Sequence, residues 1–294
     1  MNGIIVIDKP AGASSAEVVR LVKARVKPAR VGHLGTLDPF ATGVLPILVG
    51  EATKLAPFLH EGEKHYSGLI ALGAETDTLD PTGAVVRTAP VPPLDPAVIA
   101  EVAARFHGAI EQTPPVYSAI KRAGVPLYKL ARRGEEVAPP PPRTVSIERF
   151  ELAIAAPDRL RFDLVCSPGT YVRALARDLG AALGTVAYLA ELRRTQSGQF
   201  TLAMADSLAD ALAALERGDA SGLIGMRAAL AGMPEARADA ETERRLRNGD
   251  SRALDCIAPP GARKFKVVAG ERLVAIAEAT SRVTAVIERV FAAD

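Results

Sequence analysis

The chain has 294 residues, 48% of them hydrophobic and 24% charged, which excludes a disordered protein and allows one large domain with or without a small one. Two cysteines, Cys166 and Cys256, are too few for a disulfide framework, and no apolar run approaches the roughly 18 residues of a membrane span. The formal net charge of +2 identifies no partner by itself, so composition predicts only a soluble cytoplasmic protein.

The first elements predicted along the chain are a strand and a helix. Residues 3–7 form a short apolar run, which is typical of a buried strand. Ser14, with a glutamate three residues later, forms a capping box, and valines recur every four residues through Val26 on one helix face. Residues 30–43 contain too many glycines and prolines for a regular element, so we expect a loop before a short strand over 44–49.

The middle of the chain alternates regular and irregular segments. Residues 66–72 predict a strand, and residues 92–107 carry a helical pattern. Residues 112–143 are proline-rich and irregular, as a functional or disordered insertion would be. Residues 160–166 alternate apolar and polar side chains like a half-buried strand, and residues 172–183 repeat with helical spacing.

The C-terminal part differs in composition from the rest. An alanine-rich helix is predicted over 205–217, and the small residues of 218–233 form a plausible linker. A charged helix should then end near Arg247. The runs that follow favour a small β-rich domain, with strands near 253–257, 264–268, 273–277 and 283–290.

A search for catalytic motifs returns mostly exclusions. The sequence has no phosphate-binding P-loop, no G-x-G-x-x-G after a strand, no G-x-S-x-G and no H-E-x-x-H, and its four histidines and two cysteines lack metal-ligand spacing. Asp38 lies in a glycine-shaped loop, where a carboxylate can be a nucleophile or can simply cap an Asp-Pro turn. The same dipeptide recurs at Asp80, so the pattern alone leaves both interpretations open.

The segment from Gly32 to Pro46, with residues 50–54 after it, resembles the catalytic motif of the TruB-type pseudouridine synthases. This family makes pseudouridine-55 in the T loop of bacterial tRNA. Other segments resemble further motifs of the family, in order along nearly the whole chain: residues 8–12, 66–73, 76–83, 112–121, 127–132, 169–173 and 192–194. Ser14-Ser15 departs slightly from the commoner Thr-Ser pair and keeps a hydroxyl cap.

The resemblance implies an α/β (α+β) fold. Residues 1–225 would form the catalytic domain, with a mixed, largely antiparallel sheet flanked by helices and an RNA-binding insertion at about 112–143. Residues 234–294 resemble a PUA domain more weakly and would form a small β-rich RNA-binding domain. The reaction breaks the N1–C1′ bond of a uridine, rotates the base and rejoins it through C5, so the resemblance implies an isomerase without cofactor or metal.

The resemblance also implies the roles of individual residues. Asp38 would be the nucleophile, attacking ribose C1′ or base C6, and Arg173 would pair with its carboxylate. Tyr66 would stack on the target uracil, with its phenol a candidate general base, and His33 would enter the stack that the flipped base leaves. The pocket walls would be Tyr171 and Leu192. The alternatives are that Arg173 is a solvent-facing helix residue and that Tyr66 is an ordinary core tyrosine.

Charge is distributed in blocks that suggest where RNA would bind. Residues 1–60 carry 7 Lys and Arg against 4 Asp and Glu, residues 61–111 carry 3 against 8, and residues 112–200 carry 13 against 8. Basic blocks can form one face toward a polyanion, although solvated helix faces give the same pattern. The predicted contacts to the RNA backbone are Lys9, Lys121, Arg122, Lys129, Arg132 and Arg133.

The expected partner is the T stem-loop of tRNA, bound by a monomer with no obligate protein partner. Two alternatives keep the same scaffold: a non-catalytic RNA-binding or tRNA-folding protein, and a guide-RNA-dependent relative of the dyskerin type. A hydrolase with an aspartate nucleophile would need a second acid/base carboxylate, and the sequence places none near Asp38.

Overall fold

The computed structural model describes residues 1–26, 29–122, 124–133, 135, 137–280 and 284–292. Its main part is a ten-stranded sheet. The strands, in spatial order, are β14 (Asp206–Ser207), β1 (Gly3–Lys9), β3 (Thr42–Val49), β12 (Ala187–Ser197), β4 (Lys64–Leu72), β11 (Arg159–Cys166), β10 (Arg143–Ala156) and β7 (Gly108–Gln112), with β2 (Val31–His33) beside β3 and β13 (Phe200–Thr201) beside β12. Only the β14–β1 and β12–β3 neighbours are parallel, so the mixed, largely antiparallel sheet is confirmed.

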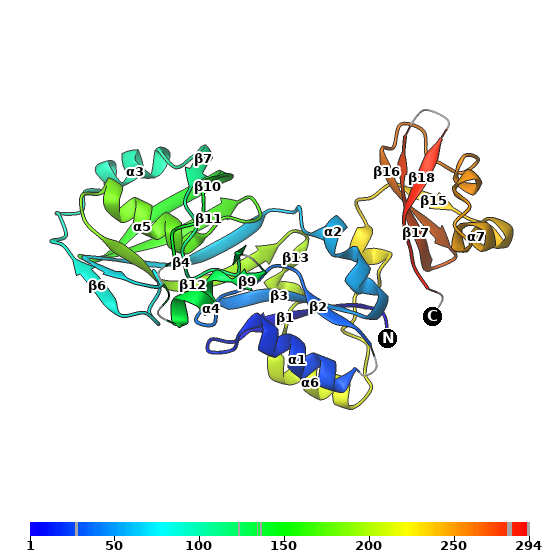
Figure 1. Cartoon of the computed structure of the whole chain (residues 1–294), viewed down its shortest axis with the longest axis horizontal. Helices are drawn as coiled ribbons and strands as arrows, with labels where there is room; N and C mark the ends of the chain where they lie inside the picture. The colour runs from blue at the N-terminus through cyan, green and yellow to red at the C-terminus, as the bar shows by residue number, and fades with distance from the viewer. Residues whose placement is uncertain (27–28, 123, 134, 136, 281–283, 293–294) are drawn as a thin grey trace.

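Helices cover the two halves of this sheet (Figure 1). The α-helices are α1 (Ser15–Arg25), α2 (Ala56–Leu59), α3 (Pro96–Ala104), α4 (Leu127–Arg132), α5 (Val172–Ala182), α6 (Leu208–Glu216) and α7 (Ala240–Arg247). The 3₁₀ turns are η1 (Gly50–Leu55), η2 (Leu202–Met204), η3 (Ala228–Leu230) and η4 (Ser251–Leu254). Helices α1 and α6 lie side by side under the half that contains β1, whereas α5 packs on β12 and α3 on β10.

The predicted cap of the first helix is confirmed. The hydroxyl of Ser14 accepts a hydrogen bond from the backbone N–H of Glu17, and Val18, Val22 and Val26 are buried on the face toward the sheet. A capped first turn satisfies backbone N–H groups that would otherwise have no partner. The local sequence is therefore sufficient to start α1 where it does.

Strand β1 is buried on both faces, which explains its unbroken apolar run. Ile5 and Ile7 belong to the core under α1 and α6, while Ile4 and Val6 point into a second core on the other face. A strand covered on both faces shows a continuous apolar run instead of alternation. The second core also includes side chains of the C-terminal domain, so β1 links the two parts of the molecule.

The C-terminal domain is a four-stranded sheet with α7 and η4 beside it. Its order is β15 (Glu235–Arg237), β16 (Lys264–Ala269), β17 (Arg272–Ala279) and β18 (Ala285–Val290). The small β-rich domain is thus confirmed, but the strand predicted at 253–257 is wrong, because Ala253 and Leu254 lie in the 3₁₀ turn η4. Leu273 and Phe291 of this domain pack into the second core.

Several elements were missed in the sequence because they are short or irregular. The predicted loop over 30–43 contains the strand β2, which pairs with β3. The irregular insertion holds the helix α4 and a hairpin of β8 (Lys121–Arg122) and β9 (Val125–Pro126), and a hairpin of β5 (Ala74–Thr76) and β6 (Val85–Thr88) follows β4. The long strands β10 and β12 each contain register shifts, which break the alternation that would reveal them.

We expect Gly43→Ala to destabilise the main sheet. Gly43 has a φ of +104°, and a β-carbon there would overlap the carbonyl oxygen of Arg194 on the neighbouring strand. Because backbone cannot move aside cheaply, the free energy of unfolding in urea should fall by about 2–4 kcal/mol. Gly184→Ala is the matched control: Gly184 has a φ of +76° but open space around it, so the loss should be about 1–2 kcal/mol. Equal losses would contradict a close approach at Gly43.

Candidate active site

The loop that carries Asp38 lies at the junction between the two halves of the main sheet. It connects β2 to β3, and β3 runs parallel to β12 through the pairs Thr42–Arg193 and Gly43–Arg194. Strand β12 therefore passes beside the end of the loop, with β4 on its other side. Helix α5 begins just after the turn that follows β11, and this turn brings Arg173, in the first turn of the helix, to the Asp38 loop.

Asp38 and Arg173 form a two-pronged ion pair. The Arg173 Nε donates to one carboxylate oxygen at 2.8 Å, and a terminal nitrogen donates to the other at 3.1 Å. The Arg173 side chain is only 5% exposed, whereas that of Asp38 keeps 31% of its surface accessible. A paired guanidinium fixes both the charge and the orientation of a carboxylate. The free surface of Asp38 is thus where a substrate atom can approach.

The remaining donors of Arg173 are also occupied. They reach the carbonyl oxygens of Thr78 at 2.6 Å and Tyr117 at 2.8 Å, and the carboxylate of Asp80 lies 3.5 Å away. Asp80 is buried and accepts hydrogen bonds from the hydroxyls of Thr78 and Thr82 and from the Thr82 backbone N–H. Arg173 is therefore the point at which the Asp38 loop, the turn after β5 and the insertion meet.

Asp80 is a site residue that the sequence analysis did not assign. The available signal was the repeated Leu-Asp-Pro tripeptide: two of its three copies place their aspartates, Asp38 and Asp80, at one guanidinium in the structure. Leu79, before Asp80, has a φ of +60°, the only positive φ of a non-glycine residue among those described. The expectation that no second carboxylate lies near Asp38 is wrong, since the fold joins two turns far apart in sequence. The Asp80 carboxylate accepts from three donors and lies 3.5 Å from Arg173, so its oxygens are occupied by contacts that fix the turn.

The electrostatic environment of Asp38 is a balance between burial and charge. Burial raises the pKa of the Asp38 carboxyl, Arg173 and Lys9 oppose that rise, and the neighbouring Asp80 adds to it. Desolvation penalises the charged form of any group, and only a close opposite charge offsets it. Arg173 is therefore the group that most strongly favours the ionised form of Asp38.

The segments on either side of Asp38 are clamped by the N-terminal turn and α1. The Ser15 hydroxyl accepts from the backbone N–H of Leu37 at 2.8 Å and donates to its carbonyl at 3.0 Å. The backbone N–H of Gly12 donates to the carbonyl of Pro39 at 2.8 Å. These contacts fix the backbone of the loop immediately before and after Asp38.

Lys9 does not fit the predicted contact with the RNA backbone. Its side chain is 0% exposed, and its ammonium donates to the carbonyls of Pro10, Ala13 and Pro39. Burial lowers the pKa of Lys9 to about 8, with the nearby Asp38 opposing the change. A fully enclosed ammonium cannot reach a phosphate, so the prediction for Lys9 is wrong. Lys9 instead links the turn after β1 to the Asp38 loop through the carbonyl of Pro39.

Tyr66 lies in the core at the centre of the sheet, between Leu164 and Arg194 on the neighbouring strands. Burial raises the pKa of its phenol, while Arg194 opposes the rise. The phenol is consequently protonated at neutral pH. This favours the predicted stacking role of Tyr66 over the role of a resting general base.

The other predicted pocket residues lie around this centre. Leu192 is buried in the main core, and Tyr171 is the N-cap residue of α5. The Arg143 guanidinium lies over the Tyr171 ring, 4.6 Å from the ring centroid. The Gln112 side chain accepts a hydrogen bond from the Tyr171 backbone N–H and donates one to the Tyr171 carbonyl. His33 is half-buried at the end of β2 with its Nδ1 atom unpartnered among the described residues.

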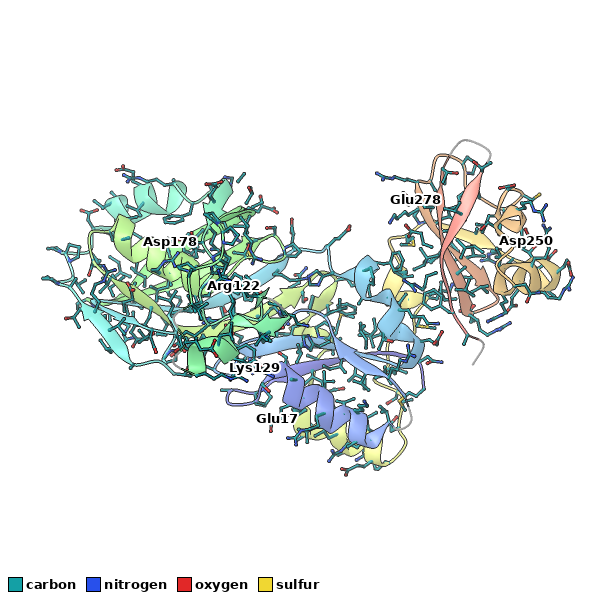
Figure 2. All side chains as sticks on the ribbon, in the orientation of Figure 1. Glu17, Arg122, Lys129, Asp178, Asp250 and Glu278 are labelled. Carbon is teal, nitrogen blue, oxygen red and sulfur yellow. The ribbon has the colours of Figure 1, made fainter. Side chains whose placement is uncertain are left out.

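The predicted RNA contacts of the insertion are on its surface. Lys121, Arg122 and Lys129 are exposed on β8 and α4. Figure 2 shows Arg122 and Lys129 near the middle of the molecule. Arg133 is exposed and lies 3.8 Å from Glu135. The side chain of Arg132 lies outside the part of the chain that the structure describes. The described basic side chains of the insertion are thus exposed, and their contact with RNA stays a prediction.

Two further cations are buried beside the site. Arg194, 1% exposed, donates to the carbonyls of Val44, Gly35 and Thr36. The ammonium of Lys64 donates to the carbonyls of Gly62 at 2.8 Å and His60 at 3.5 Å. Burial, and secondarily Arg194, lowers the pKa of Lys64 to about 8.

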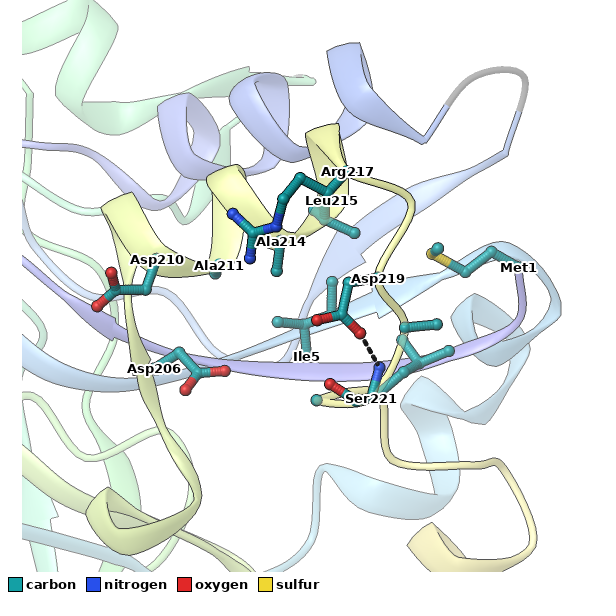
Figure 3. A pocket seen from close by; sticks show the side chains of 13 residues that line it. Met1, Ile5, Asp206, Asp210, Ala211, Ala214, Leu215, Arg217, Asp219 and Ser221 are labelled. Atoms are coloured by element: carbon teal, nitrogen blue, oxygen red, sulfur yellow. Dashed lines mark hydrogen bonds between the residues drawn. The ribbon is translucent and has the colours of Figure 1, made fainter.

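The described residues were also searched for a metal site, a membrane-spanning helix and further hollows. No group of three or more His, Cys, Asp or Glu there is arranged to hold a metal ion, and no helix among them is long and apolar enough to cross a membrane. A hollow of about 330 Å³ lies between Met1, β1 and α6, where the Asp219 carboxylate accepts from the Ser221 backbone (Figure 3). None of the residues lining it belongs to the Asp38 site.

Comparison with known proteins relates most of the chain to one family. A family profile described as TruB family pseudouridylate synthase (N terminal domain) matches residues 23–172, and one described as tRNA pseudouridylate synthase B C-terminal domain matches residues 173–234. The chain is 50% identical over 210 residues to tRNA pseudouridine synthase B of Geobacter sulfurreducens, covering 71% of this chain and 68% of that protein.

The protein of the same name from Bordetella avium is 46% identical over 217 residues, covering 73% of this chain and 88% of that protein. Among solved structures, a crystal structure of a Cbf5-Nop10-Gar1 complex matches with a TM-score of 0.74 at 26% identity, over 99% of this chain and 85% of the other. The structural match therefore extends through the C-terminal domain, beyond the two family profiles.

The depressed pKa of Lys64 predicts a pH dependence of stability. The unfolded side chain titrates near 10.5 and the folded one near 8, so between these values the unfolded state binds more protons and stability rises with pH. Relative to Lys64→Met, the wild type should gain about 1–2 kcal/mol of unfolding free energy between about pH 7.5 and 9.5, measured in urea. A constant difference across that range would show that the lysine is not desolvated.

Proposed function

We propose that this chain, which belongs to the TruB family of pseudouridylate synthases, isomerises uridine-55 in the T loop of tRNA to pseudouridine. The observation that carries the proposal is the Asp38 carboxylate, fixed by both prongs of Arg173 yet open on one side. An isomerisation that cleaves and rejoins one bond needs a single ionised nucleophile and no imported group. The curated relatives from Geobacter sulfurreducens and Bordetella avium are named tRNA pseudouridine synthase B, which supports tRNA as the substrate.

In the proposed reaction the target nucleotide leaves its stack, at a cost of a few kcal/mol, and its uracil packs on Tyr66. Asp38 then adds to ribose C1′ or to uracil C6, and the N1–C1′ bond breaks. The base rotates, C5 bonds to C1′, and the hydrogen on C5 leaves as a proton while Asp38 is released. Arg173 stabilises the carboxylate at the start and at the end of this cycle.

RNA would be held mainly by charge. The exposed cations of β8 and α4 would contact phosphates of the T stem, which positions the RNA without reading its sequence. The domain over residues 234–294 would act as a PUA-like second RNA surface, with residues 1–225 as the catalytic domain. In this proposal the enzyme works in the cytoplasm as a monomer and needs no protein partner.

The nucleophile is tested by tritium release from a tRNA transcript that carries [5-³H]uridine. Wild-type protein should release tritium from the T-loop position alone, because C5 loses its hydrogen only when the base is rejoined through carbon. Asp38→Asn should lower the rate by at least about a thousandfold. Arg173→Lys should lower it by about a hundredfold or more, since one ammonium cannot replace the paired donors.

The outcomes separate the competing functions. Release that persists in Asp38→Asn would remove this carboxylate from the mechanism. Binding of tRNA without release by the wild type would favour the non-catalytic RNA-binding or folding protein. Release that required an added guide RNA would favour the relative of the dyskerin type.

The basic surface of the insertion is tested by neutralising Lys121 and Lys129 together as glutamines. Binding of the T-arm hairpin should weaken, and the slope of log affinity against log salt should decrease by about one for each lost phosphate contact. Arg105→Gln, on an exposed arginine at the end of α3, is the control and should leave the slope unchanged. An unchanged slope in the double variant would contradict the assignment.

A further inference from the structure

The first turn of α5, which carries Arg173, is capped from another part of the chain. Tyr171 is its N-cap residue, and the Tyr171 side chain makes no capping hydrogen bond to a described residue. The hydroxyl of the preceding Thr170 donates to the carbonyl of Ser167 at 2.9 Å, so it belongs to the turn after β11. Ala174 occupies the third helical position, where a capping box has Glu or Gln. Residues next to the helix start therefore provide neither half of a local cap.

Gln112, the last residue of β7, supplies the missing bond. Its Oε1 accepts from the backbone N–H of Tyr171 at 2.8 Å, and its Nε2 donates to the Tyr171 carbonyl at 3.1 Å. The side chain is 0% exposed, so the amide has both partners and a single orientation. The bond to the N-cap N–H is the one that the Glu or Gln of a capping box makes. Gln112 thus replaces a local cap from 59 positions away in the sequence.

The ring of Tyr171 is held from the same pair of strands. Arg143 on β10 is the register partner of Gln112 on β7, and its guanidinium lies 4.6 Å from the centroid of the Tyr171 ring. A cation over an aromatic face is attracted to it. The backbone and the side chain of Tyr171 are therefore both fixed by the β7–β10 pair.

The segment that follows Gln112 continues along the same helix. The carbonyl of Thr113 accepts from Arg177 at 3.3 Å, and the carbonyl of Tyr117 accepts from Arg173 at 2.8 Å. Contacts with residues 112–117 thus extend over the first two turns of α5. They begin at Gln112, whose side chain binds the helix backbone itself.

The position of this first turn sets the geometry of the reacting carboxylate. Arg173 is the second residue after Tyr171, and its guanidinium must reach both oxygens of Asp38, at 2.8 and 3.1 Å. A two-pronged pair is sensitive to direction as well as distance, because both hydrogen bonds have to be aligned together. A small displacement of the helix start would therefore weaken the hold on Asp38.

We infer that Gln112 is a positioning residue of the reaction: by fixing the backbone of Tyr171, it places Arg173 in its two-pronged contact with Asp38. The effect on the reaction rests on the proposed function, whereas the placement of Arg173 does not. A glutamine with a purely structural role would contribute to the stability of α5 and leave the ion pair as it is. The two roles give different results in the measurements below.

The first measurement is the titration of Asp38 in protein without RNA, followed by ¹³C NMR of the carboxyl groups and assigned with Asp38→Asn. Gln112→Met has a side chain of similar length and removes both hydrogen bonds to Tyr171. The groups that act on Asp38 are Arg173, Lys9 and Asp80, and Arg173 is the strongest that favours its ionised form. A displaced Arg173 lowers the pKa of Asp38 less, so the titration should move to higher pH by about one pH unit.

The second measurement is single-turnover tritium release, which reports the chemical step without product release. Gln112→Met should lower its rate about ten- to a hundredfold, as expected for a misplaced reacting group, with little change in the tRNA concentration that gives the half-maximal rate. In the Arg173→Lys background the same substitution should add less than about a twofold loss, because the guanidinium that Gln112 places is gone.

Two further variants complete the design. Gln112→Asn is neutral and one methylene shorter, so it can keep one of the two bonds and should show smaller changes in the same directions. It also carries the test if Gln112→Met does not fold. Gln196→Met is the matched control, because the amide of Gln196 donates to the backbone carbonyl of Gly198 at 2.8 Å, in the turn after β12. It should match the wild type in both measurements.

The inference is overturned if the Gln112 variants leave the titration of Asp38 and the single-turnover rate unchanged. It is also overturned if Gln112→Met causes the same loss of rate with Arg173→Lys as without it. An absence of tritium release by wild-type protein would contradict the proposed function alone, since the titration would still decide whether Gln112 places Arg173.

Discussion

The ion pair of Asp38 with Arg173 is the constraint on which the rest of the site depends. Burial disfavours a charged carboxylate, so a nucleophile in this position needs a fixed cation. The cation is itself almost fully buried, which is costly unless every donor has an acceptor. Asp80 and the carbonyls of Thr78 and Tyr117 supply those acceptors. Three other segments of the chain are thus ordered around one guanidinium.

The same requirement applies to three further buried cations near the site. Lys9, Lys64 and Arg194 each donate to backbone carbonyls. Those of Lys9 lie in the turn after β1 and in the Asp38 loop, those of Lys64 in the turn before β4, and those of Arg194 in β3 and the Asp38 loop. Burial removes water from these charges and disfavours their ionised forms, as the lowered pKa values of Lys9 and Lys64 indicate. In return the loops that these cations contact have defined positions.

The sheet provides the rigid platform for this arrangement. Strands β1 and β3 are buried on both faces, by the core under α1 and α6 on one side and by the second core with the C-terminal domain on the other. The loop that carries Asp38 therefore leads into β3, a strand that is fixed by packing on both of its faces. Gly43 lets that strand approach the backbone of Arg194, which no residue with a β-carbon could do at this φ.

Local signals in the sequence were enough to determine the capped start of α1, the alternating strand β11 and the family motifs around Asp38 and Arg173. Their physical causes act within a few residues, so they are visible without the fold. The bulged strands β10 and β12, the burial of Lys9 and the arrival of Asp80 beside Arg173 were decided only by tertiary structure. Each depends on contacts between segments distant in sequence, which no local pattern records.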